Sequence, residues 1–240
     1  MSESIRGKEI ILAGGAGGLG SAAAELLHGE GACLTVSYRS NAARADALSG
    51  FARLVQADLT SAEDRARLLD GAPNLYGLVV FAGMPARVND PSQAEEAMRH
   101  SYEVNYLGPI LLAHEAAGRM RRSGMPGAIV LFSTMQAMGL FPGSTAYAAP
   151  KAALLHSARL LAKECRGPAN IRVNVISPGV TAAGMAEASI ASGKYDRYLT
   201  DGVVPRFGRA SDVARAVRFF LEPDNYVTGQ VLTVDGGLTL

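Results

Sequence analysis

The sequence predicts an α/β fold in which a doubly wound, parallel sheet of seven strands carries helices on both faces. Short runs rich in Val, Ile and Leu recur along the chain, and they lack the strict alternation of strands with one exposed face. Longer segments rich in Ala, Leu, Arg and Glu separate these runs, and this alternation indicates parallel strands joined by helices. No repeat, low-complexity tract or linker interrupts the pattern, so we expect one domain over residues 1–240.

In chain order, each strand candidate ends in residues that suit a turn or a binding loop. The seven candidates lie at residues 9–15, 33–39, 53–59, 77–83, 128–134, 171–179 and 230–237. The clearest helical segments between or after them are residues 20–31, 61–72 and 211–223. A further helix is expected around "AYAAPK", where Ser144 or Thr145 can cap the first turn. Pro150 then lies near the end of that turn, where a proline is best tolerated.

One stretch departs from this rhythm. Residues 181–209 have weak periodicity and several glycines, and they include Met185, Tyr195 and Tyr198. The stretch follows the carboxyl end of a strand, which is where ligands bind in open α/β sheets. We expect it to cover a substrate.

Composition excludes several classes of function. With 48% hydrophobic and 19% charged residues and a net charge of +1, the chain predicts a sizeable core, no nucleic-acid face and no membrane patch. The polar start and the lack of a long apolar run predict neither a signal peptide nor a membrane span. Two distant cysteines favour a reducing cytoplasm, and the four histidines show no metal-ligand spacing, so no metal is expected.

A glycine cluster, "AGGAGGLG", joins the first strand to the first helix. Such a turn aims the N–H groups of a helix N-terminus at a phosphate and lets the backbone approach it closely. The absence of GK[ST] disfavours a P-loop nucleotide hydrolase. A second strand ends about 20 residues further on, as in dinucleotide-binding sites. Gly14, Gly18, Leu19 and Gly20 are therefore candidate cofactor-binding residues.

The tip of the second strand predicts which dinucleotide binds. A carboxylate there accepts from the 2′-hydroxyl of NAD, whereas an arginine nearby accommodates the 2′-phosphate of NADP. Arg39 and Ser40 occupy this position, and a guanidinium fork suits phosphate. NADP(H) is the predicted cofactor and NAD(H) the second choice, because Gly17 stands in the glycine turn where some NADP-preferring proteins carry a second basic residue.

Taken together, the motifs resemble those of the short-chain dehydrogenase/reductase family over nearly the whole chain. They are the glycine turn, "ADL" with Asp58 and Leu59, "VNYLG" around Asn105, "STMQAMGLFPGSTAYAAPK", "VNVISPG" and "VTGQVLTVDGG". The resemblance implies a Rossmann-like fold. It also implies cofactor contacts from Ala82, Gly83, Tyr147, Lys151, Pro178, Gly179 and Thr181.

Tyr147 and Lys151 stand four residues apart, so they lie on one helix face. A phenol titrates near pH ~10, and a neighbouring ammonium, together with the positive nicotinamide ring of an oxidised cofactor, lowers that pKa by stabilising the phenolate. The resemblance implies that Tyr147 gives a proton to a carbonyl oxygen while hydride moves from nicotinamide to carbon. It further implies that Lys151 holds the nicotinamide ribose and that Asn105 positions a water in the proton relay.

Three positions depart from the family pattern. The serine expected thirteen residues before the tyrosine is Thr134, whose hydroxyl can still orient a substrate, with Ser133 as the second choice. Phe81 replaces an asparagine that braces neighbouring loops. Ala183 replaces a threonine, and Thr181 is the nearby substitute for a contact with the nicotinamide amide.

The pocket candidates are mostly apolar and predict an uncharged or largely hydrocarbon ketone or secondary alcohol as substrate: Met84, Pro85, Gln136, Met138, Leu140, Phe141, Val180 and Met185. A 3-oxoacyl-carrier-protein reductase is an alternative, for which Arg121, Arg122 and Arg166 could meet an acidic carrier. A non-catalytic nucleotide-binding protein is an alternative from another class. The resemblance implies a homotetramer, with a dimer as second choice, and the Ala-rich helix after Tyr147 and the last strand are suitable surfaces for it.

Overall fold

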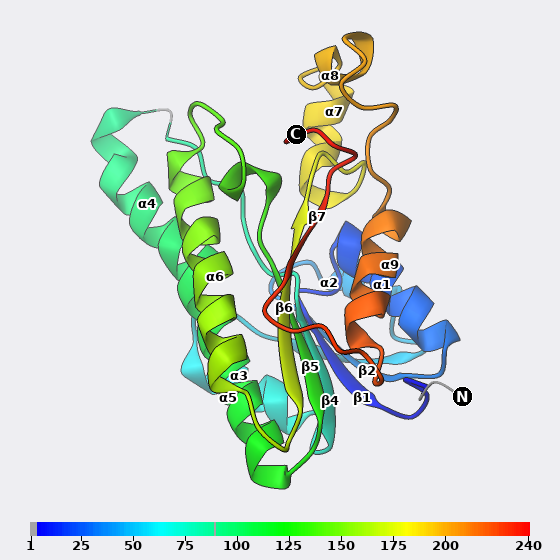
Figure 1. The fold of residues 1–240 in the computed structure, drawn as a ribbon. Coiled ribbons are helices and arrows are strands. Elements are labelled where there is room, and N and C mark those ends of the chain that lie inside the picture. The colour runs from blue at the N-terminus through cyan, green and yellow to red at the C-terminus, as the bar shows by residue number, and fades with distance from the viewer. Residues whose placement is uncertain (1–3, 89) are drawn as a thin grey trace.

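Seven parallel strands form a single sheet in the computed structural model, which describes residues 4–88 and 90–240. Their spatial order is β3-β2-β1-β4-β5-β6-β7, and Figure 1 shows the sheet between two layers of helices. All seven strand candidates are confirmed. Their bounds are β1 Glu9–Ala13, β2 Cys33–Tyr38, β3 Ala52–Gln56, β4 Leu75–Val80, β5 Gly127–Phe132, β6 Ile171–Pro178 and β7 Val231–Val234.

The helices cover both faces of the sheet, as the sequence predicts. In Figure 1, α4, α5 and α6 lie on one side of the sheet, and α1 and α9 lie on the other. The helix bounds are α1 Gly18–Gly29, α2 Ala42–Asp46, α3 Ala62–Asp70, α4 Ala94–Tyr102, α5 Gly108–Ser123, α6 Thr145–Glu164, α7 Glu187–Ala191, α8 Arg197–Thr200 and α9 Ala210–Leu221. Short turns η1 Pro91–Gln93, η3 Met135–Ala137 and η4 Gly184–Ala186 are 3₁₀-helical, and η2 Glu103–Leu107 is π-helical.

Two apolar cores flank the sheet. One packs α3, α5 and α6 on the sheet, with Leu112 and Leu154 fully or almost fully buried. The other packs α1 and α9, with Leu27 and Phe220 buried to the same degree. Strands β4 and β5 are buried along their whole length, which explains why their sequences are continuously apolar.

The strand order places a binding crevice between β1 and β4. The chain winds outward from β1 through β2 to β3 and then crosses back to place β4 on the other side of β1. Ligands bind outside the carboxyl ends of parallel strands at such a reversal. The segments that follow β1 and β4 meet here, because a Cβ on Gly14 would lie 2.9 Å from the backbone of Ala82.

Residues 181–209 project beyond the carboxyl end of the sheet and carry η4, α7 and α8 (Figure 1). The base of this excursion is closed by a bridge between Thr181 and Gly208. Ala182 N–H donates to the Gly208 carbonyl at 2.8 Å, and Gly208 N–H donates to the Val180 carbonyl at 2.9 Å. Within the described chain, no helix has the length and apolar character needed to span a bilayer.

Candidate active site

A cavity of about 680 Å³ opens at the carboxyl ends of the strands. It gathers residues from the glycine turn, the ends of β2 to β6, the start of α6 and the 181–209 segment. All the predicted site residues except Asn105 line it: Gly14, Gly18, Leu19, Gly20, Arg39, Ser40, Asp58, Leu59, Ala82, Gly83, Ser133, Thr134, Tyr147, Lys151, Pro178, Gly179 and Thr181. Residues distant in the sequence therefore share one solvent-accessible space.

The glycine turn is shaped by close backbone approaches. Gly14 has φ +72°, and its N–H donates to the Ser37 hydroxyl at 2.9 Å. A Cβ on Gly20 would lie 2.4 Å from the Gly15 carbonyl oxygen, and one on Gly18 would lie 2.7 Å from the Gly184 nitrogen. Gly17 caps α1 without a side-chain hydrogen bond, so the first turn of the helix presents N–H donors that no side chain has taken. This arrangement suits a phosphate.

Two arginines stand where β2 ends. Arg39 and Arg44 both line the cavity and are exposed. Asn41 caps α2 by accepting from the Arg44 N–H at 3.0 Å, and the Arg39 carbonyl accepts from Gln56. Neither guanidinium forms an ion pair with a carboxylate of the described residues. Arg44 was not predicted from the sequence, although its place five residues after Arg39 could have revealed it.

Tyr147 and Lys151 lie in the first two turns of α6, and both line the cavity. Lys151 is 2% exposed, and its ammonium donates to the Phe132 carbonyl at 2.9 Å. Tyr147 stays partly accessible from the cavity. Burial nevertheless raises the pKa of Tyr147 to about 12, opposed by a hydrogen bond with Thr134, while the nearby Tyr195 adds a smaller increase.

Lys151 by itself therefore does not lower the pKa of Tyr147, and the lowering expected from the lysine together with the oxidised nicotinamide stays a prediction. Burial lowers the pKa of Lys151 to about 8, because an apolar environment disfavours the ammonium. Loss of hydration disfavours the phenolate of Tyr147 and is the largest influence on its pKa. A phenol with a pKa near 12 is protonated at neutral pH, which is the form that donates a proton.

The two hydroxyl candidates before α6 have different surroundings. Ser133 is buried, and its hydroxyl donates to the Lys151 carbonyl at 2.9 Å. Thr134 begins η3, accepts from the Gln136 N–H at 3.3 Å and interacts with the Tyr147 hydroxyl. Ser133 therefore holds α6 against β5, whereas Thr134 is placed to orient a substrate oxygen beside Tyr147.

Asn105 lies beneath the cavity and is completely buried in the π-helical turn. Its side-chain oxygen Oδ1 accepts from the Met84 N–H, and its side-chain nitrogen Nδ2 donates to the Met84 carbonyl, both at 3.0 Å. A Cβ on Gly83 would lie 2.9 Å from the Asn105 oxygen and 3.1 Å from the Lys151 nitrogen. Gly83 thus allows Asn105 and Lys151 to approach the same strand end.

A chain of hydrogen bonds connects α6 to Asn105, and it starts at a backbone carbonyl that Pro150 leaves free. Pro150 is the sixth residue of α6, farther inside the helix than the sequence suggests. Because proline has no N–H, it leaves the Ala146 carbonyl without its helical donor. Ser101 donates to that carbonyl at 2.6 Å and accepts from the Asn105 amide at 3.0 Å. Ser101 carries no motif, so sequence reasoning missed it.

The helix cap also differs from the expectation. Ser144 is the N-cap residue of α6, but it makes no capping hydrogen bond with its side chain. Its hydroxyl donates instead to the Phe141 carbonyl at 2.6 Å. This bond secures the loop before α6, and Phe141 and Pro142 of that loop line the cavity.

The two other departures from the family pattern have local explanations. Phe81 packs against Phe132 with ring centres 4.5 Å apart, so an aromatic contact replaces an amide brace. Ala183 lines the cavity, and its Cβ lies 3.2 Å from the position that a Cβ on Gly18 would occupy. Thr181 also lines the cavity, but its hydroxyl donates to the Gly179 carbonyl at 3.2 Å.

Several cavity residues come from the 181–209 segment. Met185 of this segment was predicted from the sequence and lines the cavity, whereas Lys194 and Arg197 line it without having been predicted. Pro85, Gln136, Phe141 and Val180 line it as well. Met84, Met138 and Leu140 are not among its lining residues, and Leu140 is fully exposed. Over residues 4–88 and 90–240, no cluster of three or more His, Cys, Asp or Glu side chains could hold a metal ion.

Comparisons with known proteins agree with this architecture. Residues 14–239 match the family profile described as enoyl-(acyl carrier protein) reductase. An uncharacterised oxidoreductase of Methylorubrum extorquens is 34% identical, with 98% of each chain covered. The NADPH-dependent aldehyde reductase-like protein of Arabidopsis thaliana chloroplasts is 29% identical, with 97% of this chain and 94% of that protein covered.

A solved structure extends the likeness to the fold. A 7α-hydroxysteroid dehydrogenase complexed with NADH and 7-oxo glycochenodeoxycholic acid superposes with a TM-score of 0.87 and 30% identity, covering 98% of this chain and 95% of that one. The profile match spans almost the whole chain, and the ordered motifs meet at one cavity. This protein is an oxidoreductase of the short-chain dehydrogenase/reductase family, which acts on alcohol and carbonyl groups.

Proposed function

We propose that the protein is an NADP(H)-dependent oxidoreductase that interconverts a ketone and a secondary alcohol, with Tyr147 as the acid and base. The observation that carries this proposal is the position of Tyr147. Its hydroxyl interacts with Thr134 in a cavity that the glycine turn also lines. The glycine turn, which suits a phosphate, and the protonated phenol therefore line the same cavity.

The residues around the cavity fit a dinucleotide. Close approaches at Gly14, Gly18 and Gly20 leave no room for side chains at these three positions, and the first turn of α1 suits a diphosphate. When bound, the cofactor supplies or accepts a hydride. Lys151 is the candidate for holding the nicotinamide ribose, and Pro178, Gly179 and Thr181 form the wall after β6.

The chain's own residues supply the proton and the orientation. Tyr147 is protonated at neutral pH, so it can donate to a carbonyl oxygen. Thr134 directs that oxygen by a second hydrogen bond. Lys151 places a positive charge one helical turn from the phenol, and Asn105, fixed by Met84 and Ser101, holds the position we assign to a relay water. Segment 181–209 covers the substrate and excludes water.

Arg39 and Arg44 support the choice of NADP(H). No carboxylate lines the end of β2, and the acid that does line this part of the cavity, Asp58, follows β3. Asp58 accepts from the N–H and hydroxyl of Thr60, at 2.9 and 2.8 Å. Two guanidiniums without carboxylate partners suit a 2′-phosphate. NAD(H) remains the second choice, since the hydroxysteroid dehydrogenase above was solved with NADH.

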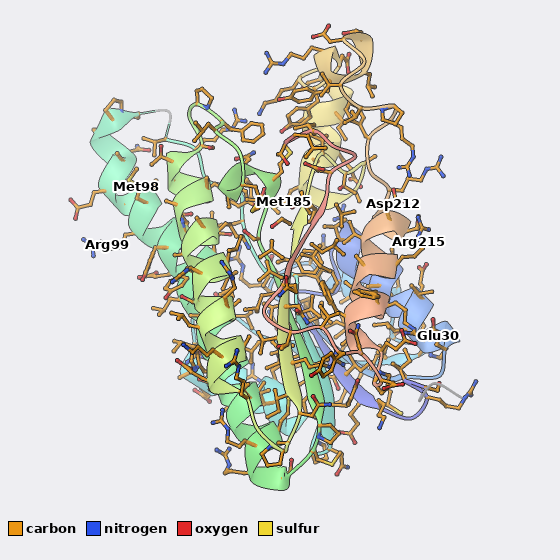
Figure 2. All side chains as sticks on the ribbon, in the orientation of Figure 1. Glu30, Met98, Arg99, Met185, Asp212 and Arg215 are labelled. Atoms are coloured by element: carbon orange, nitrogen blue, oxygen red, sulfur yellow. The ribbon has the colours of Figure 1, made fainter. Side chains whose placement is uncertain are left out.

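A homotetramer is our proposal for the assembly. Large apolar side chains are exposed on the outer helical layer and on β7, including Met98, Tyr102, Leu160 and Leu232. Figure 2 shows Met98 and Arg99 on α4, far from the 181–209 segment. Burial of these surfaces against other copies would remove apolar area from water. A cytoplasmic location is inferred from the two free cysteines, Cys33 and Cys165.

An acyl carrier gains no support from the three arginines considered above. Arg121 and Arg122 end α5, and Arg166 follows α6, so all three lie where β5 and β6 begin. The cavity lies at the opposite end of these strands. Arg121 also donates to the Glu164 carbonyl at 3.4 Å. A carrier docked on these residues would face away from Tyr147.

The proposal is tested by titrating the protein with NADPH and NADH and by assaying a panel of ketones with the tighter cofactor. We expect tighter binding of NADPH and oxidation of NADPH that depends on a ketone. Equal binding of NADPH and NADH would refute the cofactor preference but leave the proposed oxidoreductase activity standing. Failure to bind either cofactor would favour a non-catalytic role instead.

A further inference from the structure

The charged residues of the cavity are almost all basic. Its lining includes Arg39, Arg44, Arg87, Lys151, Lys194 and Arg197, but Asp58 is the one carboxylate among the described lining residues. Arg39, Arg44 and Asp58 lie by β2 and β3, at the part assigned to the adenosine of the cofactor. Lys194 and Arg197 belong to the 181–209 segment and need a separate explanation.

Lys194 and Arg197 stand on the reaction side of the cavity. Tyr195, which follows Lys194 in the sequence, lines the same cavity as Tyr147 and is close enough to raise the pKa of Tyr147. The Lys194 ammonium lies 5.2 Å from the centre of the Tyr195 ring. The Arg197 carbon lies 5.2 Å from the centre of the Tyr198 ring, and the two rings are 6.2 Å apart.

Neither cation is neutralised by an ion pair. No carboxylate in the described part of the chain lies within ion-pair distance of Lys194 or Arg197. Asp196 and Asp201 are neighbours in sequence, but they do not line the cavity. The Tyr198 hydroxyl hydrogen-bonds with Arg197 and raises its pKa, to which the charge of Asp201 adds a small increase, but neither contact amounts to an ion pair. By contrast, Arg206 and Arg215 outside the cavity both pair with Asp212, as Figure 2 shows for Asp212 and Arg215 at the start of α9.

We propose that Lys194 and Arg197 bind an anionic group, such as a carboxylate, at the end of the substrate remote from its carbonyl. Phe141, Pro142 and Met185 line the same cavity, so the body of the substrate is apolar. This inference rests on the proposed function and changes the expected substrate from an uncharged ketone to an amphiphilic keto acid. The aromatic rings hold the two cations in place, and their exposed positions let the anion stay partly hydrated.

The test uses pairs of substrates that differ only in charge. Linear methyl ketones with a terminal carboxylate, spaced by two to eight methylene groups, are compared with their methyl esters. For the wild-type protein we expect kcat/KM to favour the acid by about tenfold at the matching length. The Lys194→Gln/Arg197→Gln variant should lose this preference while its kcat/KM for the ester stays within a few fold. Added salt should reduce the wild-type preference.

A matched control removes two positive charges elsewhere. Lys8 lies 5.1 Å from the centre of the Tyr76 ring, and Arg122 is exposed at the end of α5. Lys8→Gln/Arg122→Gln should keep the preference for the acid. The Kd for NADPH should be the same in all three proteins. A weaker Kd in the cavity variant would assign the cations to the cofactor and overturn the proposal.

A binding measurement separates this proposal from the proposed function. If the wild-type protein reduces none of the ketones, calorimetric titration with the same acids and esters still tests the anion site. Tighter binding of the acid that disappears in Lys194→Gln/Arg197→Gln supports the site, although the enzymatic proposal has then failed. Equal affinities for acid and ester, or a preference that survives in the variant, would refute it.

Discussion

Two lysines line the same cavity in opposite ways. Lys151 is 2% exposed, and its ammonium is bonded to the Phe132 carbonyl. Lys194 lies exposed above the Tyr195 ring on a segment of short helices. The first belongs to a framework of buried side chains bonded to backbone groups, which also contains Ser133 and Asn105. The second belongs to the excursion that is closed at its base by Thr181 and Gly208.

The buried framework around Lys151 is suited to the chemical step, and the exposed segment around Lys194 is suited to substrate recognition. A buried polar residue has to keep its hydrogen bonds, because an unsatisfied buried group is costly. Changes in the framework should therefore alter both stability and turnover. Exposed cations are solvated with or without a ligand, and their replacement costs little stability. Changes there should alter which molecule binds, and leave the fold and the chemical step intact.

The largest effect is expected for Tyr147→Phe. Removing the hydroxyl deletes the proton donor, and we expect kcat to fall by roughly 10³-fold. Affinity for NADPH should stay within a few fold, because the glycine turn is unchanged. Steady-state kinetics and a cofactor titration measure the two quantities. Turnover close to that of the wild type would refute the assignment of Tyr147 as acid.

Arg39→Asp tests recognition at the other exposed end of the cavity. A carboxylate repels a 2′-phosphate and accepts from a ribose hydroxyl, so the ratio of NADPH to NADH affinity should fall by about 100-fold. The change should leave the melting temperature almost unaltered, since Arg39 is exposed. Arg122→Asp, on the exposed end of α5, is the control. An unchanged affinity ratio would mean that the 2′-phosphate is read elsewhere.

Ser101→Ala should weaken the framework through two bonds at once. It removes the donor to the Ala146 carbonyl and the acceptor for the Asn105 amide. We expect a loss of about 1–3 kcal/mol in the free energy of unfolding and roughly tenfold in kcat. Denaturant unfolding and steady-state kinetics provide the two readouts.

Pro150→Ala supplies the matched partner for this change. Alanine restores an N–H that can reach the Ala146 carbonyl along the helix. The double variant should regain much of the stability lost in Ser101→Ala, with a coupling of about 1 kcal/mol. Its kcat should stay low, because the Asn105 amide still lacks Ser101. Purely additive stabilities would show that Pro150 and Ser101 act independently.

The sequence predicts much of this framework and little of the recognition around it. Parallel strands and the glycine turn follow from local patterns, and the tyrosine and lysine share a helix face because they are four residues apart. Ser101 and Ser133 have no distinguishing motif, since their roles depend on which carbonyl another element leaves beside them. The raised pKa of Tyr147 was missed because burial is a property of the assembled cavity. Lys194 and Arg197 were missed because exposed charges are common and only the fold turns these two toward the cavity.

The last prediction concerns stability, and it sharpens the contrast between the two lysines. Burial lowers the pKa of Lys151 from 10.5 to about 8, so below pH 8 the folded protein holds an ammonium in an unfavourable environment. Lys151→Met removes that cost, and also leaves the Phe132 carbonyl without its donor. We expect the variant to be inactive but about 1–2 kcal/mol more stable than the wild type at pH 7.

The pH dependence identifies the cause of this stabilisation. Between pH 8 and 10.5 the unfolded wild-type chain binds more protons at Lys151 than the folded chain does, so wild-type stability rises with pH across this window. The advantage of Lys151→Met should therefore be greatest below pH 8 and shrink toward pH 10. Lys194→Met, at the exposed lysine, should change stability at neither pH. A stability difference for Lys151→Met that is constant from pH 7 to 10 would attribute the effect to packing, and the buried charge would then carry no cost for the fold.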